Sequence, residues 1–96
     1  MSDDILLWEI LVPTVIDREV RGGLNTVPIR TRYHRVWDKK AREIAYGLTI
    51  FKPANGQSVS DDDELHIERM IPVRIACTKK QILEIAEFTR DYYNQL

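Results

Sequence analysis

Residues 65–77, LHIERMIPVRIAC, decide the fold because apolar and polar residues alternate along them with a period of two. Successive side chains of a β-strand point to opposite faces of a sheet. The alternation therefore predicts one long strand with a buried face and a wetter one. Proline lacks the backbone N–H that a ladder uses, so Pro72 predicts a break or bulge near residues 70–72.

Two shorter strands are predicted outside this stretch. Residues 5–12 are almost continuously apolar, and residues 48–51 form a second short apolar run. Such runs are typical of strands that are packed on one face and partly covered on the other. The fold therefore contains at least three strands.

Two amphipathic helices are predicted, at residues 33–46 and 78–93. Both segments carry apolar side chains at three- and four-residue steps. Thr31 is expected to cap the start of the first helix, and Gly47 is expected to take the left-handed conformation after its end. The Thr78-Lys79-Lys80-Gln81 sequence matches a capping box at the start of the second helix.

The connections between these elements have turn chemistry. Residues 14–32 include Gly22-Gly23 and show no sustained period, so we expect a long loop. Asn55-Gly56 is a strong reversal signal and predicts a turn over residues 52–57.

The order strand, loop, helix, strand, hairpin, strand, helix predicts an α+β fold of the ferredoxin-like split βαβ type in a single domain, residues 1–96. Two helices would cover one face of an antiparallel sheet, with the long strand between the other two. The final strand of that fold has no counterpart here, so it is expected to be missing or contributed by a partner. The strand at 5–12 is then an apolar edge, for which we expect cover by a second copy.

Length and composition narrow the class of protein. The chain has 96 residues, 44% apolar and 30% charged, which is typical of an ordinary globular domain. Its net charge of −1 offers no global attraction to nucleic acid or to an anionic membrane. Residues 1–4 are acidic where a signal peptide would be basic, and the apolar run after them is too short to span a bilayer. By default we expect a cytoplasmic protein with no membrane partner.

The middle third of the chain resembles a family of small uncharacterised bacterial domains. Gly47-Leu48-Thr49-Ile50, Gly56-Gln57 and Glu68-Arg69 carry the resemblance, and Ser58 stands where that family tends to have Trp. The resemblance implies a ferredoxin-like fold. It implies no activity and no catalytic residue.

Four side chains are candidates for binding a small ligand on the open face of the sheet: Trp8, His66, Glu68 and Arg74. His66 and Glu68 lie two residues apart, and an arginine fork suits a carboxylate or phosphate group. Zinc sites usually need three or four ligands, so we predict no metal and no cofactor. Because Cys77 is expected to be buried and the hydroxyl side chains lack an evident His and acid partner, no catalytic residue is predicted.

Positive charge gathers in one part of the chain. Residues 14–46 hold eight Lys or Arg and four Asp or Glu, a local excess of four positive charges. Arg30, Arg32 and Arg35 are therefore candidates for contact with an anion or with a partner protein. The long strand lacks the aromatic side chains that stack on bases in RNA-binding sheets. The sequence also contains no Gly-rich phosphate-binding loop motif.

Three functions remain open from the sequence. The first is a non-enzymatic interaction or assembly module that forms a homodimer through its sheet. The second is a small-ligand-binding protein or enzyme of the dimeric α+β barrel type, with its pocket on the open sheet face. The third is nucleic-acid binding through the arginine-rich loop 17–35.

Overall fold

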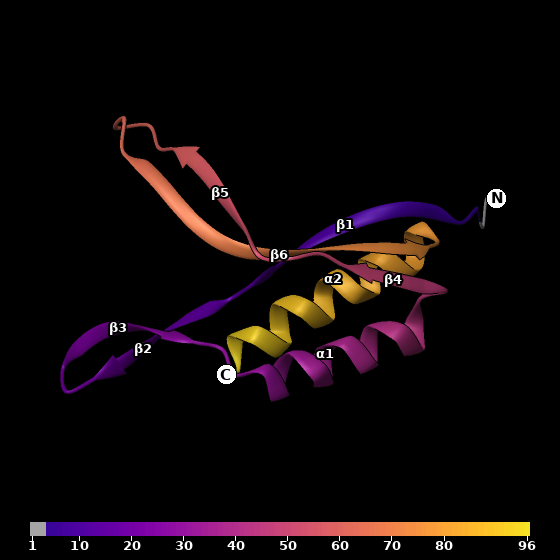
Figure 1. The fold of residues 1–96 in the computed structure, drawn as a ribbon, viewed down its shortest axis with the longest axis horizontal. Coiled ribbons are helices and arrows are strands. Elements are labelled where there is room, and N and C mark those ends of the chain that lie inside the picture. Colours follow the sequence, from indigo (N-terminus) through magenta and orange to yellow (C-terminus); the bar gives the residue numbers. More distant parts are fainter. Residues whose placement is uncertain (1–3) are drawn as a thin grey trace.

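The computed structural model describes residues 4–96, and the side chains of all of these except residues 18 and 20. Residues 1–3, part of the acidic start on which the expected location rests, lie outside this range. Figure 1 shows an α+β fold with antiparallel sheets, as predicted, and with more strands than predicted. The elements are β1 (Leu6–Pro13), β2 (Val15–Val20), β3 (Gly23–Pro28), α1 (Thr31–Ile44), β4 (Gly47–Ile50), β5 (Ala54–Val59), β6 (Leu65–Cys77) and α2 (Lys79–Asn94).

The long strand β6 is the centre of a four-stranded antiparallel sheet. It pairs with β1 along one side and with β4 and then β5 along the other. The order β1-β6-β4 confirms the predicted central position of the long strand. β6 forms hydrogen-bonded pairs with all three remaining strands of this sheet. The alternation of its side chains therefore fixes which side chains of β1 and β4 face the core.

Pro72 lies where the ladder on one side of β6 is interrupted. Three residues, 51–53, separate β4 from β5, whereas only residues 71 and 72 separate their partners on β6. The N–H of Phe51 donates to the carbonyl of Pro72 at 3.0 Å, so the Pro72 nitrogen also points to this interrupted side. The register with β1 runs past Pro72 without a shift. The predicted bulge is confirmed on the β4–β5 side alone.

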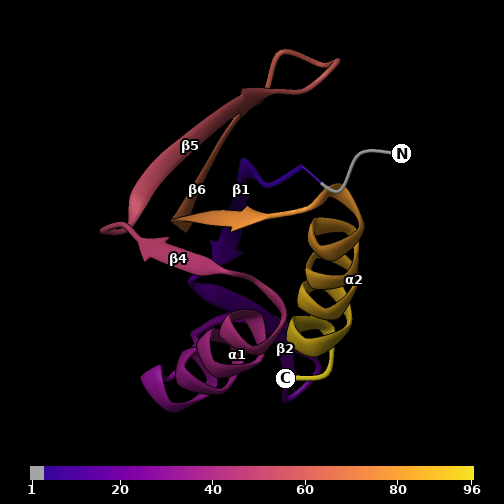
Figure 2. The ribbon, with the colours of Figure 1, turned by 90° about the vertical axis from the view of Figure 1, so that its right-hand side faces the viewer.

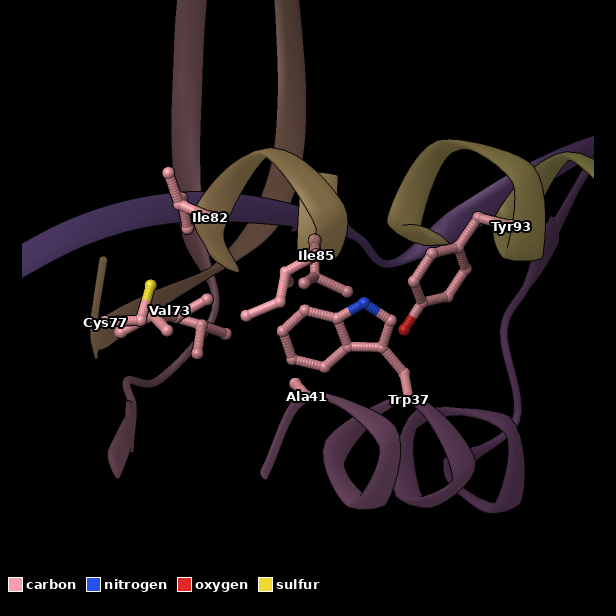
Figure 3. Close-up of a cluster of buried hydrophobic side chains, with 9 residues drawn as sticks. Trp37, Ala41, Val73, Cys77, Ile82, Ile85 and Tyr93 are labelled. Atoms are coloured by element: carbon pink, nitrogen blue, oxygen red, sulfur yellow. The ribbon is translucent and has the colours of Figure 1, made fainter. Parts of the chain in front are cut away.

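The core lies between this sheet and the two helices, which cover the same face of it (Figure 2). Val73, Ile75 and Cys77 of β6 are fully buried there, so the expected packing role of Cys77 is confirmed. Each large apolar side chain buried in this way contributes about 1.5–3 kcal/mol. Figure 3 shows the indole of Trp37 lying between α1 and α2, and its Nε1–H donates to the Thr89 hydroxyl at 2.8 Å.

The two helices begin in different ways. At α2 the capping box is confirmed: the Thr78 hydroxyl accepts from the Gln81 N–H at 3.2 Å, and the Gln81 side chain accepts from the Thr78 N–H at 2.9 Å. At α1 the predicted cap is wrong, because the helix begins at Thr31 itself, and Arg30 precedes it without a side-chain cap. The predicted left-handed Gly47 is also wrong, since the chain turns directly into β4 there.

The loop predicted over residues 14–32 is wrong, because residues 15–28 form a β-hairpin and residues 31 and 32 already belong to α1. β2 and β3 pair from Val15–Pro28 to Val20–Gly23, which leaves Arg21 and Gly22 as a two-residue turn. Both turn residues have positive φ angles, 51° and 82°. This is the backbone of a type I′ turn, whose twist matches that of the strands it joins. Gly22 allows that geometry, so the glycine marks a hairpin tip and not a loop.

The predicted turn at Asn55-Gly56 is also wrong. Both residues lie inside β5, where they pair with Arg69 and Glu68. A Cβ on Gly56 would lie 2.7 Å from the terminal methyl of Met70, so a larger residue there requires the flexible end of the Met70 side chain to shift. The chain reverses at residues 60–64 instead, where Asp63 has a φ of 61°.

Two hairpins project from the body of the molecule as arms (Figures 1 and 2). We call residues 15–28 the first arm and residues 54–70 the second arm. The predicted buried face of the long strand does not hold in the second arm, where Leu65 and Ile67 are 58% and 59% exposed. Neither helix among the described residues is long and apolar enough to cross a membrane.

Candidate functional site

The four predicted ligand-binding residues do not form one site. Trp8 pairs with Ile75 and belongs to the face of the sheet that carries the helices, where its Nε1–H donates to the Cys77 carbonyl at 3.0 Å. Arg74 belongs to the opposite face, which no helix covers. Alternation separates the two sets of side chains within one strand. It does not show which set of a neighbouring strand lies on the same face of the sheet, because that depends on the register.

His66 and Glu68 lie on the second arm, away from Arg74. Both are exposed and pair with Ser58 and Gly56 of β5. Eight residues of strand separate His66 from Arg74, which is about 26 Å at ~3.3 Å per residue. Within the described part of the chain, no three His, Cys, Asp or Glu side chains gather closely enough to hold a metal ion.

The three predicted arginines stay together at the start of α1. Arg30 precedes the helix, and Arg32 and Arg35 lie in its first turns, all exposed. The Arg32 guanidinium donates to the Tyr33 hydroxyl at 3.0 Å and lies 4.8 Å from the centre of its ring. Arg30 and Arg32 also line a hollow of about 220 Å³ against the first arm. This part of the molecule therefore presents a basic surface.

The opposite charge lies on the tip of the second arm. Residues 58–68 hold five acidic side chains and no Lys or Arg. Ser60 holds the turn by donating to the Asp62 carboxylate, and that hydrogen bond lowers the pKa of Asp62. The chain thus carries a basic surface, formed by Arg30, Arg32 and Arg35, and an acidic tip, formed by residues 58–68.

The uncovered face of the sheet is largely apolar. Leu7 is 74% exposed and Leu11 is 52% exposed on β1, and both point away from the helices. Phe51 lies across β6 from them, on the β4 side, with the Arg74 guanidinium 5.1 Å from the centre of its ring. Glu9 and Arg74 are direct cross-strand neighbours at the middle of this face. With Phe51 they line an open hollow of about 460 Å³.

A cleft of about 550 Å³ separates the bases of the two arms. Thr14 closes its floor, because its hydroxyl donates to the Arg69 carbonyl at 2.8 Å. Residues of β1 and the first arm form one wall, and residues 67–70 of β6 form the other.

One cluster that the sequence did not reveal lies between the helices. The ring of His34 on α1 makes a 2.7 Å hydrogen bond through Nδ1 with the Tyr93 hydroxyl on α2. Asp38 lies one turn further along α1. Burial lowers the pKa of His34, although the Asp38 charge opposes that shift, and burial raises the pKa of Asp38. Burial also holds the pKa of Tyr93 well above its ordinary value, so the phenol stays protonated.

The only sequence signal for this cluster was the four-residue spacing of His34 and Asp38, which places both on one side of a helix. Tyr93 is 59 residues away in the chain, and its approach depends on how the two helices pack. Perturbed pKa values gather at functional sites, so this cluster is a candidate in its own right.

Comparisons with models of known families, with curated proteins and with solved structures find no match to this chain. The resemblance of the middle third to small bacterial domains therefore stays a prediction.

Proposed function

We propose that this chain is an assembly module, in which two copies pack together through the uncovered faces of their sheets. The observation that carries the proposal is the exposure of Leu7 and Leu11 on a sheet face that no helix covers. A sheet in a globular fold buries its apolar face against another layer. The helices supply that layer on one side, and a second copy would supply it on the other.

The polar residues of this face suit a symmetric partner. Glu9 and Arg74 carry opposite charges at its centre. Across a two-fold axis, each can meet the opposite charge of the other copy, so neither is buried unpaired. Phe51 adds an aromatic side chain, a residue type enriched at the centres of interfaces.

The distribution of charge also favours a second copy as the partner. Each copy has a basic surface at Arg30, Arg32 and Arg35, and an acidic tip over residues 58–68. A two-fold axis lets the tip of each copy approach the basic surface of the other, so that both contacts form at once. Such complementarity steers association and fixes its register.

We also propose that β1, α1, β4, β6 and α2 correspond to the ferredoxin-like split βαβ unit. The strand order β1-β6-β4 and the two helices on one face support this correspondence. On this view the first arm is an insertion between β1 and α1, and the second arm extends the hairpin between β4 and β6.

The experiment that tests the assembly is light scattering during size-exclusion chromatography, over a range of protein concentrations. The wild-type chain is expected to elute as a dimer. Leu7→Asp places a charge at the centre of the proposed interface and is expected to elute as a monomer with an unchanged circular dichroism spectrum. Leu83→Asp is the matched control, since Leu83 is 61% exposed on α2, in the other layer. It is expected to remain a dimer.

A wild-type monomer at several hundred micromolar, or an equal effect of the two aspartates, contradicts the proposal. A further variant separates face packing from edge pairing. The β1–β6 register places the N–H of Glu9 on the free edge of β1, so Glu9→Pro blocks strand addition at that edge. Glu9→Ala is the companion variant, because it removes the same carboxylate and keeps the N–H. A dimer that responds equally to Glu9→Pro and Glu9→Ala and is lost in Leu7→Asp uses the face, whereas loss in Glu9→Pro alone indicates pairing at the edge.

A further inference from the structure

A small cavity lies beside the His34 cluster, on the helix-covered side of the sheet. Its volume is about 220 Å³. Apolar side chains from α1 and from three strands form its floor, and three polar side chains of α1 form its rim. The floor is Val12, Trp37, Ile50, Ile71 and Val73, and the rim is Thr31, His34 and Asp38.

Asp38 is the rim residue whose carboxylate has no hydrogen-bond donor from the described part of the protein. It is half-buried, and it makes no hydrogen bond or ion pair with any described residue. The Arg42 charge opposes the effect of burial on the pKa of Asp38, but Arg42 is exposed and does not line the cavity. No buried side-chain oxygen among the described residues lacks a partner, so the Asp38 oxygens are open to water and receive no donor from the protein. The cavity therefore offers an acceptor that lacks a donor.

His34 supplies a second polar group in a fixed orientation. The hydrogen bond between Nδ1 and the Tyr93 hydroxyl holds the ring against α2. The Nε2 atom makes no hydrogen bond within the described residues and is left for a ligand. Burial lowers the pKa of His34, so the ring is neutral near neutral pH and adds no positive charge to the cavity. An anion would meet only the Asp38 carboxylate as a charged group of the lining.

We propose that this cavity binds a small organic cation, with an ammonium group that donates to Asp38 and an apolar body that packs on the floor. The volume sets the size of that body. A dry cavity of about 150 Å³ holds benzene, and pockets for drug-sized molecules begin near 300 Å³. A cavity between these limits suits about eight to ten heavy atoms, such as one aromatic ring with a short chain.

The probe is 2-phenylethylammonium, titrated near neutral pH and followed by NMR. The methyl groups of Ile71 and Val73 and the indole of Trp37 are expected to shift together and to saturate. Two analogues of the same shape separate charge from apolar packing. The neutral 2-phenylethanol is expected to bind at least about tenfold more weakly, and the anionic phenylacetate, which is also within the size limit, is expected to leave these signals unchanged.

Asp38→Asn removes the charge with almost no change in shape, and it is expected to weaken binding of the ammonium probe at least about tenfold. Asp61→Asn is the matched control, because the same change at the exposed acidic tip is expected to leave binding unaltered. Ile50→Phe keeps Asp38 and fills the cavity from a position that is 49% exposed. It is expected to abolish the shifts without unfolding the chain.

Equal binding to wild type and Asp38→Asn overturns the proposal, and so does equal binding of the ammonium and the carboxylate. Shifts confined to residues outside the cavity overturn it as well. The cavity and the proposed dimer face lie on opposite sides of the sheet, so either proposal can fail while the other stands.

Discussion

The hydroxyl of Thr89 connects the two helices through two hydrogen bonds. It donates to the Ile85 carbonyl at 2.6 Å within α2 and accepts from the Trp37 indole at 2.8 Å across the helix interface. It is a buried polar residue in an apolar cluster, and both of its hydrogen-bonding roles are used. Among the described residues, the Thr89 hydroxyl is the only hydrogen-bond acceptor of the Trp37 indole N–H.

Thr89→Val keeps the shape of the side chain and removes its hydroxyl, which leaves the buried Trp37 N–H without an acceptor. We expect the free energy of unfolding to fall by about 1–3 kcal/mol, measured by urea denaturation. Thr49→Val makes the same change at an exposed position of β4 and should alter it by less than about 0.5 kcal/mol. Equal losses for the two variants would show that the hydroxyl of Thr89 has no special role.

His34 gives the fold a pH dependence whose sign follows from its environment. Burial lowers the pKa of the folded-state ring below the 6.5 of the unfolded chain. The unfolded chain therefore binds a proton first as the pH falls, and stability is lost from about pH 6.5 downward until the lowered folded pKa is passed. Asp38 acts in the opposite sense at lower pH, because its pKa is raised above 3.8 in the folded chain.

We expect thermal melts between neutral pH and about pH 5 to show a falling melting temperature for the wild type. His34→Gln should flatten that slope, whereas His66→Gln, a change at an exposed histidine of the second arm, should leave it unchanged. A slope that survives in His34→Gln places the titrating group elsewhere.

At the scale of elements, the strands and helices that carry strong periodicity were predictable. The long strand has the predicted bounds, and β1, β4 and α2 lie within one residue of prediction at each end. These segments could be predicted because burial imposes a period on their composition. The helix α1 lies two residues earlier than predicted at both ends, because its start has no cap signal.

The two arms were predicted less well, and for a physical reason. Each is a hairpin with little buried surface. Residues 15–28 and 54–59 show no strong alternation of apolar and polar residues, and the alternation of residues 65–70 predicted a buried face that this arm does not have. Gly22 and Gly56 look alike in the sequence, yet one forms a turn and the other lies within a strand against Met70. The cavity at Asp38 could not be predicted at all, since its floor comes from four separate elements.

The arms and the core should also differ in local stability. A two-stranded hairpin is marginal on its own, whereas residues 73–77 are held between β1 and β4 over the buried core. In hydrogen exchange, we expect amides of β5 and of residues 65–70 to exchange at least about tenfold faster than those of residues 73–77. Uniform protection along β6 would mean that the second arm is held as firmly as the core.

The whole molecule is extended for its length. Its radius of gyration is 15.2 Å, whereas a compact chain of 96 residues has about 12–13 Å. The longest axis measures 49 Å and the shortest 24 Å. The arms account for this shape, because both project from the body on the same side (Figure 1).

Small-angle scattering from the Leu7→Asp variant, the expected monomer, should give a radius of gyration near that of the extended shape, with an elongated distance distribution. A value near that of a compact chain would mean that the arms fold back onto the body. Leu83→Asp serves as the control, because the same charge placed on α2 leaves the proposed dimer intact and should give the larger radius of gyration of two copies.

Pro72 has a consequence for how this chain can be changed. The ladder on one side of β6 is interrupted there, so the hydrogen bonds of the second arm end before those of the core sheet begin. When residues are added to or removed from the arm in pairs, the side chains of residues 73–77 keep facing the same sides of the sheet as before. The arm can therefore be lengthened, shortened or exchanged for another hairpin as a separate part. Pro72 marks the point at which such a graft should be joined.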